Sequence, residues 1–273
     1  MTLNRANDVR PTEPTRHGAY LCLTAAHRER RIAGDLRALA ERLGLRNEFD
    51  PGDGHPSQAI AFLRRVDAAR PPRATDLADD ALLGAAAIIH VAAPGPGPVQ
   101  ALRDELTRLV APAPPPRVLG GVVRTLLYTG VEMYNFSYAH QVLQQPARVA
   151  SHAFLLPMTK TSAWWAKDWM ERHTYFLPRY DGAGRMTHQG HALASAGGIP
   201  SLMRRTYRHP EHPAPPGTYD FLTYFECDDA GVPVFHQTCA ALRDLARNPE
   251  WAFVREGPTW HGHRVAGWDD LFA

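Results

Sequence analysis

The sequence has no long apolar run, few cysteines and no strong charge imbalance. No stretch approaches the roughly 20 apolar residues that a membrane-spanning helix needs. Three cysteines, Cys22, Cys227 and Cys239, without any CxxC spacing, are too few for a disulfide framework. Lys and Arg number 30 against 28 Asp and Glu, so the formal net charge is only +2. This balance argues against a nucleic-acid-binding surface.

The first 17 residues are polar and lack the apolar segment of a secretory signal. We therefore expect no signal peptide, and we predict a disordered tail over residues 1–17. Few cysteines and no apolar span together predict a cytoplasmic protein with no membrane partner, and the charge balance predicts no nucleic-acid partner.

The chain does contain enough apolar residues, 44% of 273, to build a large core. Apolar spacing predicts strands and helices in similar order in both halves. We expect an α+β fold of two ferredoxin-like halves, 18–150 and 151–273, that pack into a barrel. The predicted strands are Ala19–Thr24, Ala85–Val91, Val118–Leu127, Ala153–Leu156, Leu202–Tyr207, Tyr219–Phe225 and Trp251–Arg255. The predicted helices are Arg28–Leu43, Ala59–Val66, Val99–Val110, Ser162–Arg172, Met186–Ala196 and Pro233–Leu245.

The second half contains a histidine and an arginine of chemical interest. His191 precedes Arg204, and a strand-like run, Phe221–Phe225, follows. Imidazole is the usual protein ligand of haem iron, and guanidinium stays charged at any relevant pH. The pair could hold a metal and steer an anion towards it. The alternative is an ordinary surface histidine and a solvated arginine, since the chain has 14 histidines.

Further residues near this pair could contribute to a site. Trp164 and Trp165 offer flat apolar surface that suits a macrocycle, or they are plain core. Glu250 could accept the free ring N–H of a metal-bound histidine. His188 and His191 form an HxxH pattern on a predicted helix, which is half of a zinc site, but no HExxH is present. Zinc is therefore the minor alternative.

Five segments in the second half resemble the chlorite dismutase superfamily of haem-binding dimeric α+β barrels. They are FLLPMTKTSAWW, the GH pair at 190–191, MRRTY at 203–207, YDFLTYFE at 219–226 and NPEWAFVREGPTWHG at 248–262. The resemblance runs from about Phe154 to the C-terminus. The first half matches only in its pattern of elements, so we expect residues 18–150 to bind no haem.

The resemblance implies a role for each matching residue. His191 would be the axial ligand of haem b, with Glu250 as its hydrogen-bond partner. Arg204 would be the catalytic distal arginine, or Arg205 if the register slips by one. The remaining residues that the resemblance assigns to the haem site are Trp164, Trp165 and Lys160.

The sequence also departs from the family pattern. The interval from Trp165 to His191 is longer, and its extra part, Trp169–Asp181, could form a lid or an interface. If the alignment fails there, His173 or His188 would be the ligand instead. Glu256 stands where large-subunit chlorite dismutases place a tryptophan near the haem. Leu156 occupies the place of the catalytic tyrosine of coproheme decarboxylases, which argues against decarboxylation.

The resemblance implies a haem b oxidoreductase that cleaves chlorite or a peroxide, and therefore a small anionic or peroxide substrate. One alternative is a biosynthetic haem enzyme that acts on a nitrogen–oxygen bond, as aldoxime dehydratases do. Another is a haem carrier or sensor without turnover. Fold alone does not separate these functions, so the residues and geometry of the site have to distinguish them. The family also implies a homo-oligomer, either a dimer or a pentamer.

Overall fold

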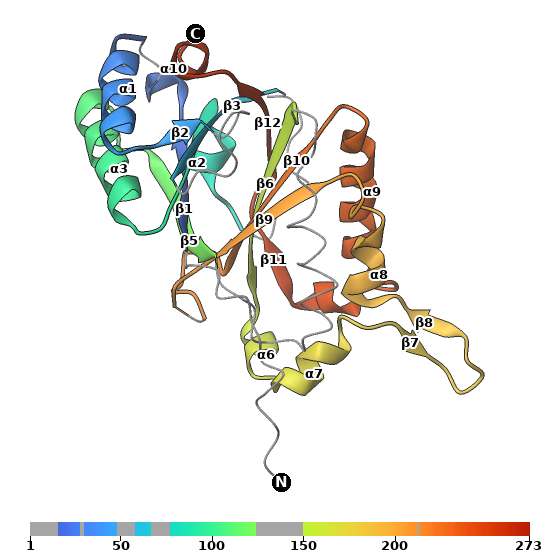
Figure 1. Cartoon of the computed structure of the whole chain (residues 1–273). Helices are drawn as coiled ribbons and strands as arrows, with labels where there is room; N and C mark the ends of the chain where they lie inside the picture. Colours follow the sequence, from blue (N-terminus) through green and yellow to red (C-terminus); the bar gives the residue numbers. More distant parts are fainter. Residues whose placement is uncertain (1–15, 28–29, 48–57, 67–76, 124–149, 212) are drawn as a thin grey trace.

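A closed β-sheet lies between two layers of helices (Figure 1). The computed structural model describes residues 16–27, 30–47, 58–66, 77–123, 150–211 and 213–273. In the first half, α1 (Ala33–Arg42) and α3 (Gly97–Val110) cover one side of the sheet. In the second half, α8 (Gly190–Ala196) and α9 (Gly231–Arg243) cover the other side.

The sheet closes because its first and last main strands pair with each other. The strand order is β10-β9-β5-β1-β4-β3-β12-β6, and β6 also pairs with β10. The two halves meet where β5 pairs with β9 and where β3 pairs with β12, so each half contributes to one barrel. The strands of the barrel are β1 (Arg16–Leu23), β3 (Ala59–Arg65), β4 (Ala87–Ala93), β5 (Arg117–Val123), β6 (His152–Lys160), β9 (Met203–Arg208), β10 (Phe221–Cys227) and β12 (Trp260–Val265). Two short strands, β2 (Arg46–Asn47) and β11 (Val254–Glu256), extend it at β3 and β6.

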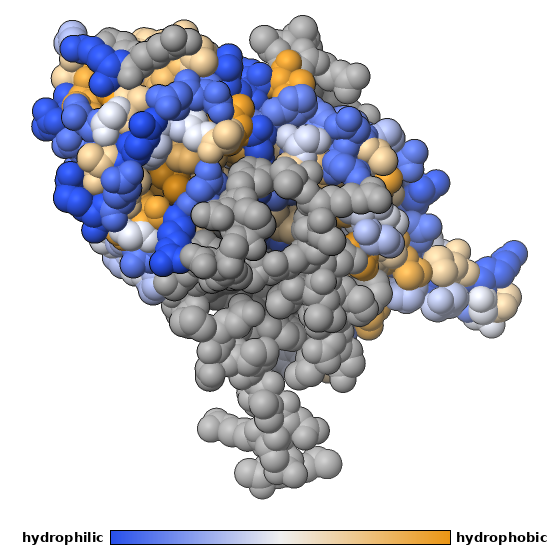
Figure 2. Space-filling view, turned by 45° about the horizontal axis from the view of Figure 1, so that its top comes forward, coloured by the Kyte–Doolittle hydropathy of each residue, from blue (hydrophilic) through white to orange (hydrophobic). Residues whose placement is uncertain are grey.

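Short elements connect the barrel to its helical layers. They are the 3-10 turns η2 (Ala25–His27), η3 (Arg30–Ile32) and η5 (Pro249–Phe253), and the helices α2 (Asp80–Leu83), α6 (Ser162–Trp165), α7 (Trp169–Thr174) and α10 (Trp268–Leu271). A separate hairpin, β7 (Arg179–Tyr180) and β8 (Met186–His188), extends from the body in both views (Figures 1 and 2).

The α+β fold with strands and helices in both halves is confirmed. Three predicted elements are wrong. Ala59–Val66 is a strand rather than a helix, because both of its faces are buried and the apolar run has no distinct period. The predicted helix Met186–Ala196 begins only at Gly190 and is preceded by β8, so His188 and His191 do not share a helix. Trp251–Arg255 is mainly the 3-10 turn η5, and strand β12 was missed.

Several other predictions need smaller adjustments. The predicted helix Ser162–Arg172 is interrupted, because Asp168 caps a new helix by accepting a hydrogen bond from Glu171 N at 2.8 Å. The predicted tail over 1–17 lies outside the described residues, except that Arg16 and His17 already belong to β1. The predicted strand Val118–Leu127 is described only to Val123. The division of the chain at residue 150 stays a prediction.

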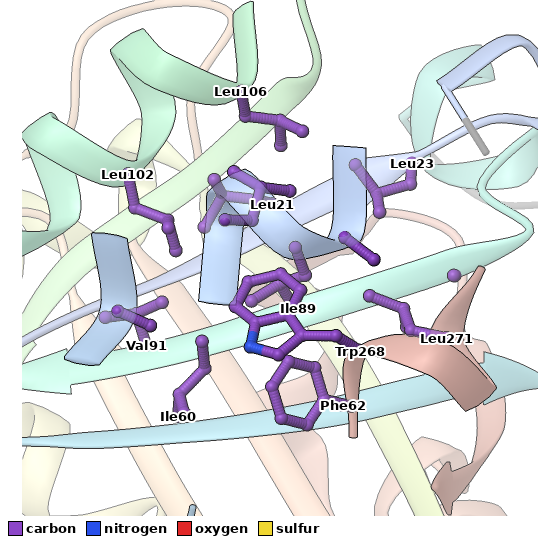
Figure 3. Packing of buried hydrophobic residues seen from close by; sticks show 14 of the residues in the cluster. Leu21, Leu23, Ile60, Phe62, Ile89, Val91, Leu102, Leu106, Trp268 and Leu271 are labelled. Atoms are coloured by element: carbon purple, nitrogen blue, oxygen red, sulfur yellow. The ribbon is translucent and has the colours of Figure 1, made fainter. Parts of the chain in front are cut away.

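One apolar core lies between α1, α3 and the outer face of the first-half strands. Leu21, Ile89 and Leu102 meet there with Trp268 of α10 (Figure 3). The Trp268 ring packs edge-on against Phe62, with centroids 4.7 Å apart. The last helix of the chain therefore completes the core of the first half.

A second core fills the barrel and is rich in aromatic rings. Tyr20 contacts His90, Tyr207 and Tyr224, and the His90 Nε2 atom lies 2.8 Å from the Tyr207 hydroxyl. The Trp260 indole donates to the carbonyl oxygen of Ala85 at 2.9 Å. These contacts give hydrogen-bond partners to buried polar atoms, which would destabilise the fold without them. The barrel interior is thus occupied by side chains, and a pocket for a large ligand must lie outside it.

Among the described residues, no helix has the length and apolar character needed to cross a bilayer.

Candidate haem site

A pocket lies between the outer face of the second-half strands and the helices that cover them. It contains about 970 Å³ of space free of protein atoms, counting the part open to solvent. Its sheet side is lined by Leu156 and Met158 of β6, Arg204 and Thr206 of β9, and Thr223 of β10. Side chains on one face of a strand recur at every second residue, as they do here. Helix α9 and turn η5 supply most of the opposite wall, including Phe235, Cys239, Leu242 and Trp251.

A buried carboxylate connects a histidine and a lysine at one end of this pocket. Glu250 Oε2 lies 2.8 Å from His191 Nδ1, and Glu250 Oε1 accepts a hydrogen bond from the Lys160 ammonium. Glu250 is 3% exposed, so both of its oxygens depend on these partners. The other ring nitrogen of His191, Nε2, makes no hydrogen bond with a described residue. His191 lines the pocket, so the arrangement leaves one imidazole nitrogen for a ligand.

Its lysine and histidine partners keep Glu250 ionised. Burial acts to raise the pKa of Glu250, but the Lys160 ammonium and the His191 ring outweigh burial and lower this pKa to about 2. An ionised Glu250 accepts the His191 Nδ1 proton at neutral pH. That bond fixes the tautomer with the proton on Nδ1, which leaves the Nε2 lone pair available.

The extra segment before α8 holds His191 in place. The carbonyl oxygens of Tyr175 and Phe176 accept hydrogen bonds from His191 N at 3.1 Å and Ala192 N at 3.0 Å. They satisfy two of the N–H groups that the first turn of a helix cannot pair internally. The Phe176 ring also packs 5.2 Å from the His191 ring. The segment therefore anchors the start of α8, and a role as a lid or an interface stays a prediction.

Arg204 and Arg205 lie on opposite faces of β9. Arg204 lines the pocket from the sheet side, together with Arg208 four residues later on the same face, whereas Arg205 is not among the lining residues. The register therefore favours Arg204 as the residue that reaches a bound group. Two guanidinium groups on one wall give this side of the pocket a positive potential for anions.

The remaining predicted residues lie around the pocket rather than in it. Trp164 is fully buried below the Lys160 ammonium, which lies 4.2 Å from its ring centroid. Trp165 packs 6.3 Å from the ring of Phe221, which does line the pocket. His173 in α7 and His188 in β8 do not line it. The structure thus brings together His191, Glu250, Lys160 and Arg204, with the tryptophans packed behind.

Sequence reasoning did not predict the contacts of two carboxylates near the site. Asp220 is buried and accepts hydrogen bonds from Lys160 N at 2.7 Å and from the Thr159 hydroxyl, so it fixes the end of β6. Its only sequence signal is a charged residue directly before an apolar strand. Glu256 accepts hydrogen bonds from Arg243 and Trp251, and no local pattern predicts that contact.

Comparison with solved structures identifies the architecture. A structure of the chlorite dismutase from Candidatus Nitrospira defluvii, with one arginine replaced by lysine, superimposes with a TM-score of 0.65 at 18% identity. The alignment covers 96% of this chain and 95% of that one. The chain has the chlorite dismutase fold. The same chlorite dismutase in complex with imidazole gives a TM-score of 0.64 at 17% identity, with coverage of 94% and 93%.

The chlorite dismutase fold is shared over 96% of this chain, but the sequence identity is only 18%. No protein-family model matches the sequence, and no curated protein is significantly similar to it. Because the first half is covered as well as the second, the resemblance extends beyond the motifs found after Phe154. The likeness establishes the fold, and the activity has to be argued from the site.

The residues present fit the haem that a chlorite dismutase fold implies. The donor set contains one imidazole whose Nδ1 is engaged by a carboxylate and whose Nε2 is left for iron. The walls are mostly apolar, as a porphyrin requires, and include Leu156, Phe221 and Phe225. Among the described residues, no group of three or more His, Cys, Asp or Glu is arranged to hold a metal ion alone. The zinc alternative therefore gains no support.

Proposed function

We propose that this chain binds haem b with His191 as the axial ligand. The observation that carries the proposal is the chain of contacts from Lys160 through Glu250 to His191 Nδ1 at one end of an apolar pocket. Glu250 holds the imidazole in one tautomer and makes Nε2 a stronger electron-pair donor to a metal. Burial and the Lys160 ammonium keep this carboxylate in place.

The reaction proposed is cleavage of a small oxygen-bearing oxidant, either chlorite or a peroxide. Bound haem would supply the redox chemistry of its iron. Arg204 enters the pocket from the sheet side, where its guanidinium attracts an anionic oxidant and stabilises negative charge on a departing oxygen. Leu242, Phe235 and the other apolar lining residues limit water in the pocket, which strengthens the effect of that cation.

Leu156 supports oxidant cleavage over propionate decarboxylation. It lines the pocket from the middle of β6, at the position where the resemblance places the catalytic tyrosine of coproheme decarboxylases, and it has no group that can exchange a proton. We extend the proposal to a homo-oligomer located in the cytoplasm.

Titration of the purified protein with haemin, followed by absorption spectroscopy, tests the haem proposal. The wild-type protein should give a saturable Soret band, and His191→Ala should lose or strongly shift it. His188→Ala is the matched control, because His188 lies outside the pocket. A Soret band that is identical in His191→Ala would refute the axial role of His191.

An oxygen electrode then tests the reaction with chlorite, and a peroxidase assay tests hydrogen peroxide. Oxygen release from chlorite or oxidation of a dye by peroxide supports the proposed activity. Stable haem binding without either reaction contradicts it and favours the carrier function. Turnover of an oxime without added oxidant favours the alternative enzyme class.

A further inference from the structure

A second carboxylate, the half-buried Glu256 of β11, connects three elements beside the pocket. Its Oε1 accepts hydrogen bonds from Arg243 Nε at 2.8 Å and from the Trp251 indole N–H at 2.7 Å. Its Oε2 accepts a bond from Arg243 Nη2 at 2.5 Å. A two-point guanidinium–carboxylate pair restricts both distance and orientation. Glu256 therefore fixes the end of α9 and the turn η5 relative to β11.

The turn that Glu256 holds is the turn that carries Glu250. Trp251 directly follows Glu250 in η5, and a 3-10 turn has weaker backbone hydrogen bonds than an α-helix. Side-chain contacts must therefore supply much of its rigidity. Asn248 Nδ2 also donates to Leu242 O at 2.9 Å at the entrance of the turn. A rotation of η5 that moves the Trp251 indole also moves the Glu250 carboxylate, which lies 2.8 Å from His191 Nδ1.

We propose that Glu256 is a positioning residue that acts through Trp251 to hold Glu250 against His191. This inference rests on the proposed function, in which His191 is the haem ligand. Without the Glu256 carboxylate, η5 gains freedom and the Glu250–His191 hydrogen bond weakens. With a weaker hydrogen bond, the imidazole would donate its electron pair less strongly to a bound iron, and haem would be released faster.

The chain offers a matched control in Glu226. This buried carboxylate accepts hydrogen bonds from Arg264 Nη1 at 2.7 Å to both oxygens and from the Tyr224 hydroxyl at 2.6 Å. It has the same kind of partners as Glu256, an arginine and an aromatic donor, but it does not line the pocket. Glu226→Gln therefore reports the cost of disturbing a buried ion pair elsewhere in the barrel.

The test measures the iron–histidine stretching frequency of the ferrous protein and the rate of haem transfer to apomyoglobin. The variants are Glu256→Gln, Trp251→Phe, their combination and Glu226→Gln. Glu256→Gln and Trp251→Phe should each lower the iron–histidine stretching frequency. Each should also raise the rate of haem loss by roughly three- to tenfold, which is less than the increase expected when a direct hydrogen-bond partner of the ligand is lost. The combined variant should lose haem no faster than the more affected single variant.

A readout without haem separates this inference from the proposed function. In the haem-free protein, the His191 Nδ1–H proton signal, assigned by its loss in His191→Ala, should exchange with water faster in Glu256→Gln. If haem does not bind through His191, the proposed function fails, and this exchange rate still decides the positioning role. Unchanged exchange, or equal effects of Glu226→Gln and Glu256→Gln, would overturn it. Additive haem-loss effects in the combined variant would refute action through Trp251.

Discussion

Arg204 and Arg205 are adjacent in β9 and point to opposite faces of the strand, and of the two only Arg204 lines the pocket. Arg204→Ala should reduce chlorite turnover by about 100-fold, because a cation aimed at developing negative charge commonly contributes a few kcal/mol. Haem binding should persist, since the axial ligand is untouched. Arg205→Ala is the control and should keep most of the activity. Steady-state oxygen release at saturating haemin measures both, and full activity in Arg204→Ala would refute its role.

The low pKa of Glu250 predicts how the stability of the haem-free protein depends on pH. The folded-state pKa of about 2 lies below the ordinary value of 4.5, so the ionised group stabilises the fold above about pH 4.5. That contribution is lost as the pH falls towards 2. The difference between these two pKa values corresponds to a contribution of about 3 kcal/mol to the free energy of unfolding.

The free energy of unfolding of Glu250→Gln should therefore differ most from that of the wild type near neutral pH, and the difference should shrink below pH 4.5. Urea unfolding at a series of pH values measures this difference. Glu105→Gln removes the partner of the exposed Arg108 in a surface ion pair and should leave the profile close to that of the wild type, because solvent screens such pairs. A constant difference between Glu250→Gln and wild type across this range would contradict the assignment.

At the level of residues, the sequence was most informative where a side chain belongs to a local motif. Lys160 and Glu250 were placed by the segments around them, and the structure brings both to His191. The contacts of Asp220 with Lys160 and of Glu256 with Arg243 were not predicted, because they form only after separate elements pack. Trp164 lies against the Lys160 ammonium and does not line the pocket, and its contact with haem stays a prediction, since burial of a tryptophan does not reveal which cavity it borders.

At the scale of elements, the start of α8 depends on Gly190. Its φ is +66°, and a Cβ atom there would lie 2.5 Å from Leu177 O and 2.8 Å from Phe176 O. Gly190→Ala should thus destabilise the protein by about 1–3 kcal/mol, through backbone strain and displacement of the segment that anchors α8. Haem affinity should fall as well, because His191 is the next residue.

Gly197→Ala is the matched control at the other end of α8. Its φ is −60°, and an added Cβ would meet nothing within 4 Å. This variant should match the wild type in thermal unfolding and haemin titration. Equal behaviour of the two alanine variants would show that the tight approach of Gly190 to the preceding segment does not position His191.

Element prediction failed where a short apolar run has no distinct period. Ala59–Arg65 is buried on both faces because helices cover one side and the barrel core lies on the other. Such a run cannot be told from a buried helix by spacing alone. The segment Met186–Ala196 was predicted as one continuous helix, although Gly190 with its positive φ separates strand β8 from helix α8. Long helices such as α3 and α9 were predicted well because their apolar stripe repeats several times.

At the scale of the whole molecule, the two halves share one closed sheet. Sequence patterns predicted two similar halves, but strand pairing between distant segments leaves no local signal. The pairing of β3 with β12 joins residues about 200 positions apart, and only the fold reveals it. Helix α10 makes the same point, because it lies at the end of the second half and packs in the core of the first (Figure 3).

Trp268→Ala tests whether this shared core couples the halves. Trp268 is 6% exposed and packs against Phe62, so its loss should cost about 3–5 kcal/mol. Trp169, which is 54% exposed in α7, provides the control, and Trp169→Ala should change stability by less than about 0.5 kcal/mol. Because β12 and α10 link both halves, amides of α3 and α9 should lose protection from hydrogen exchange by the same factor in Trp268→Ala. Loss of protection confined to α3 would mean that the first half unfolds independently of the pocket that contains His191.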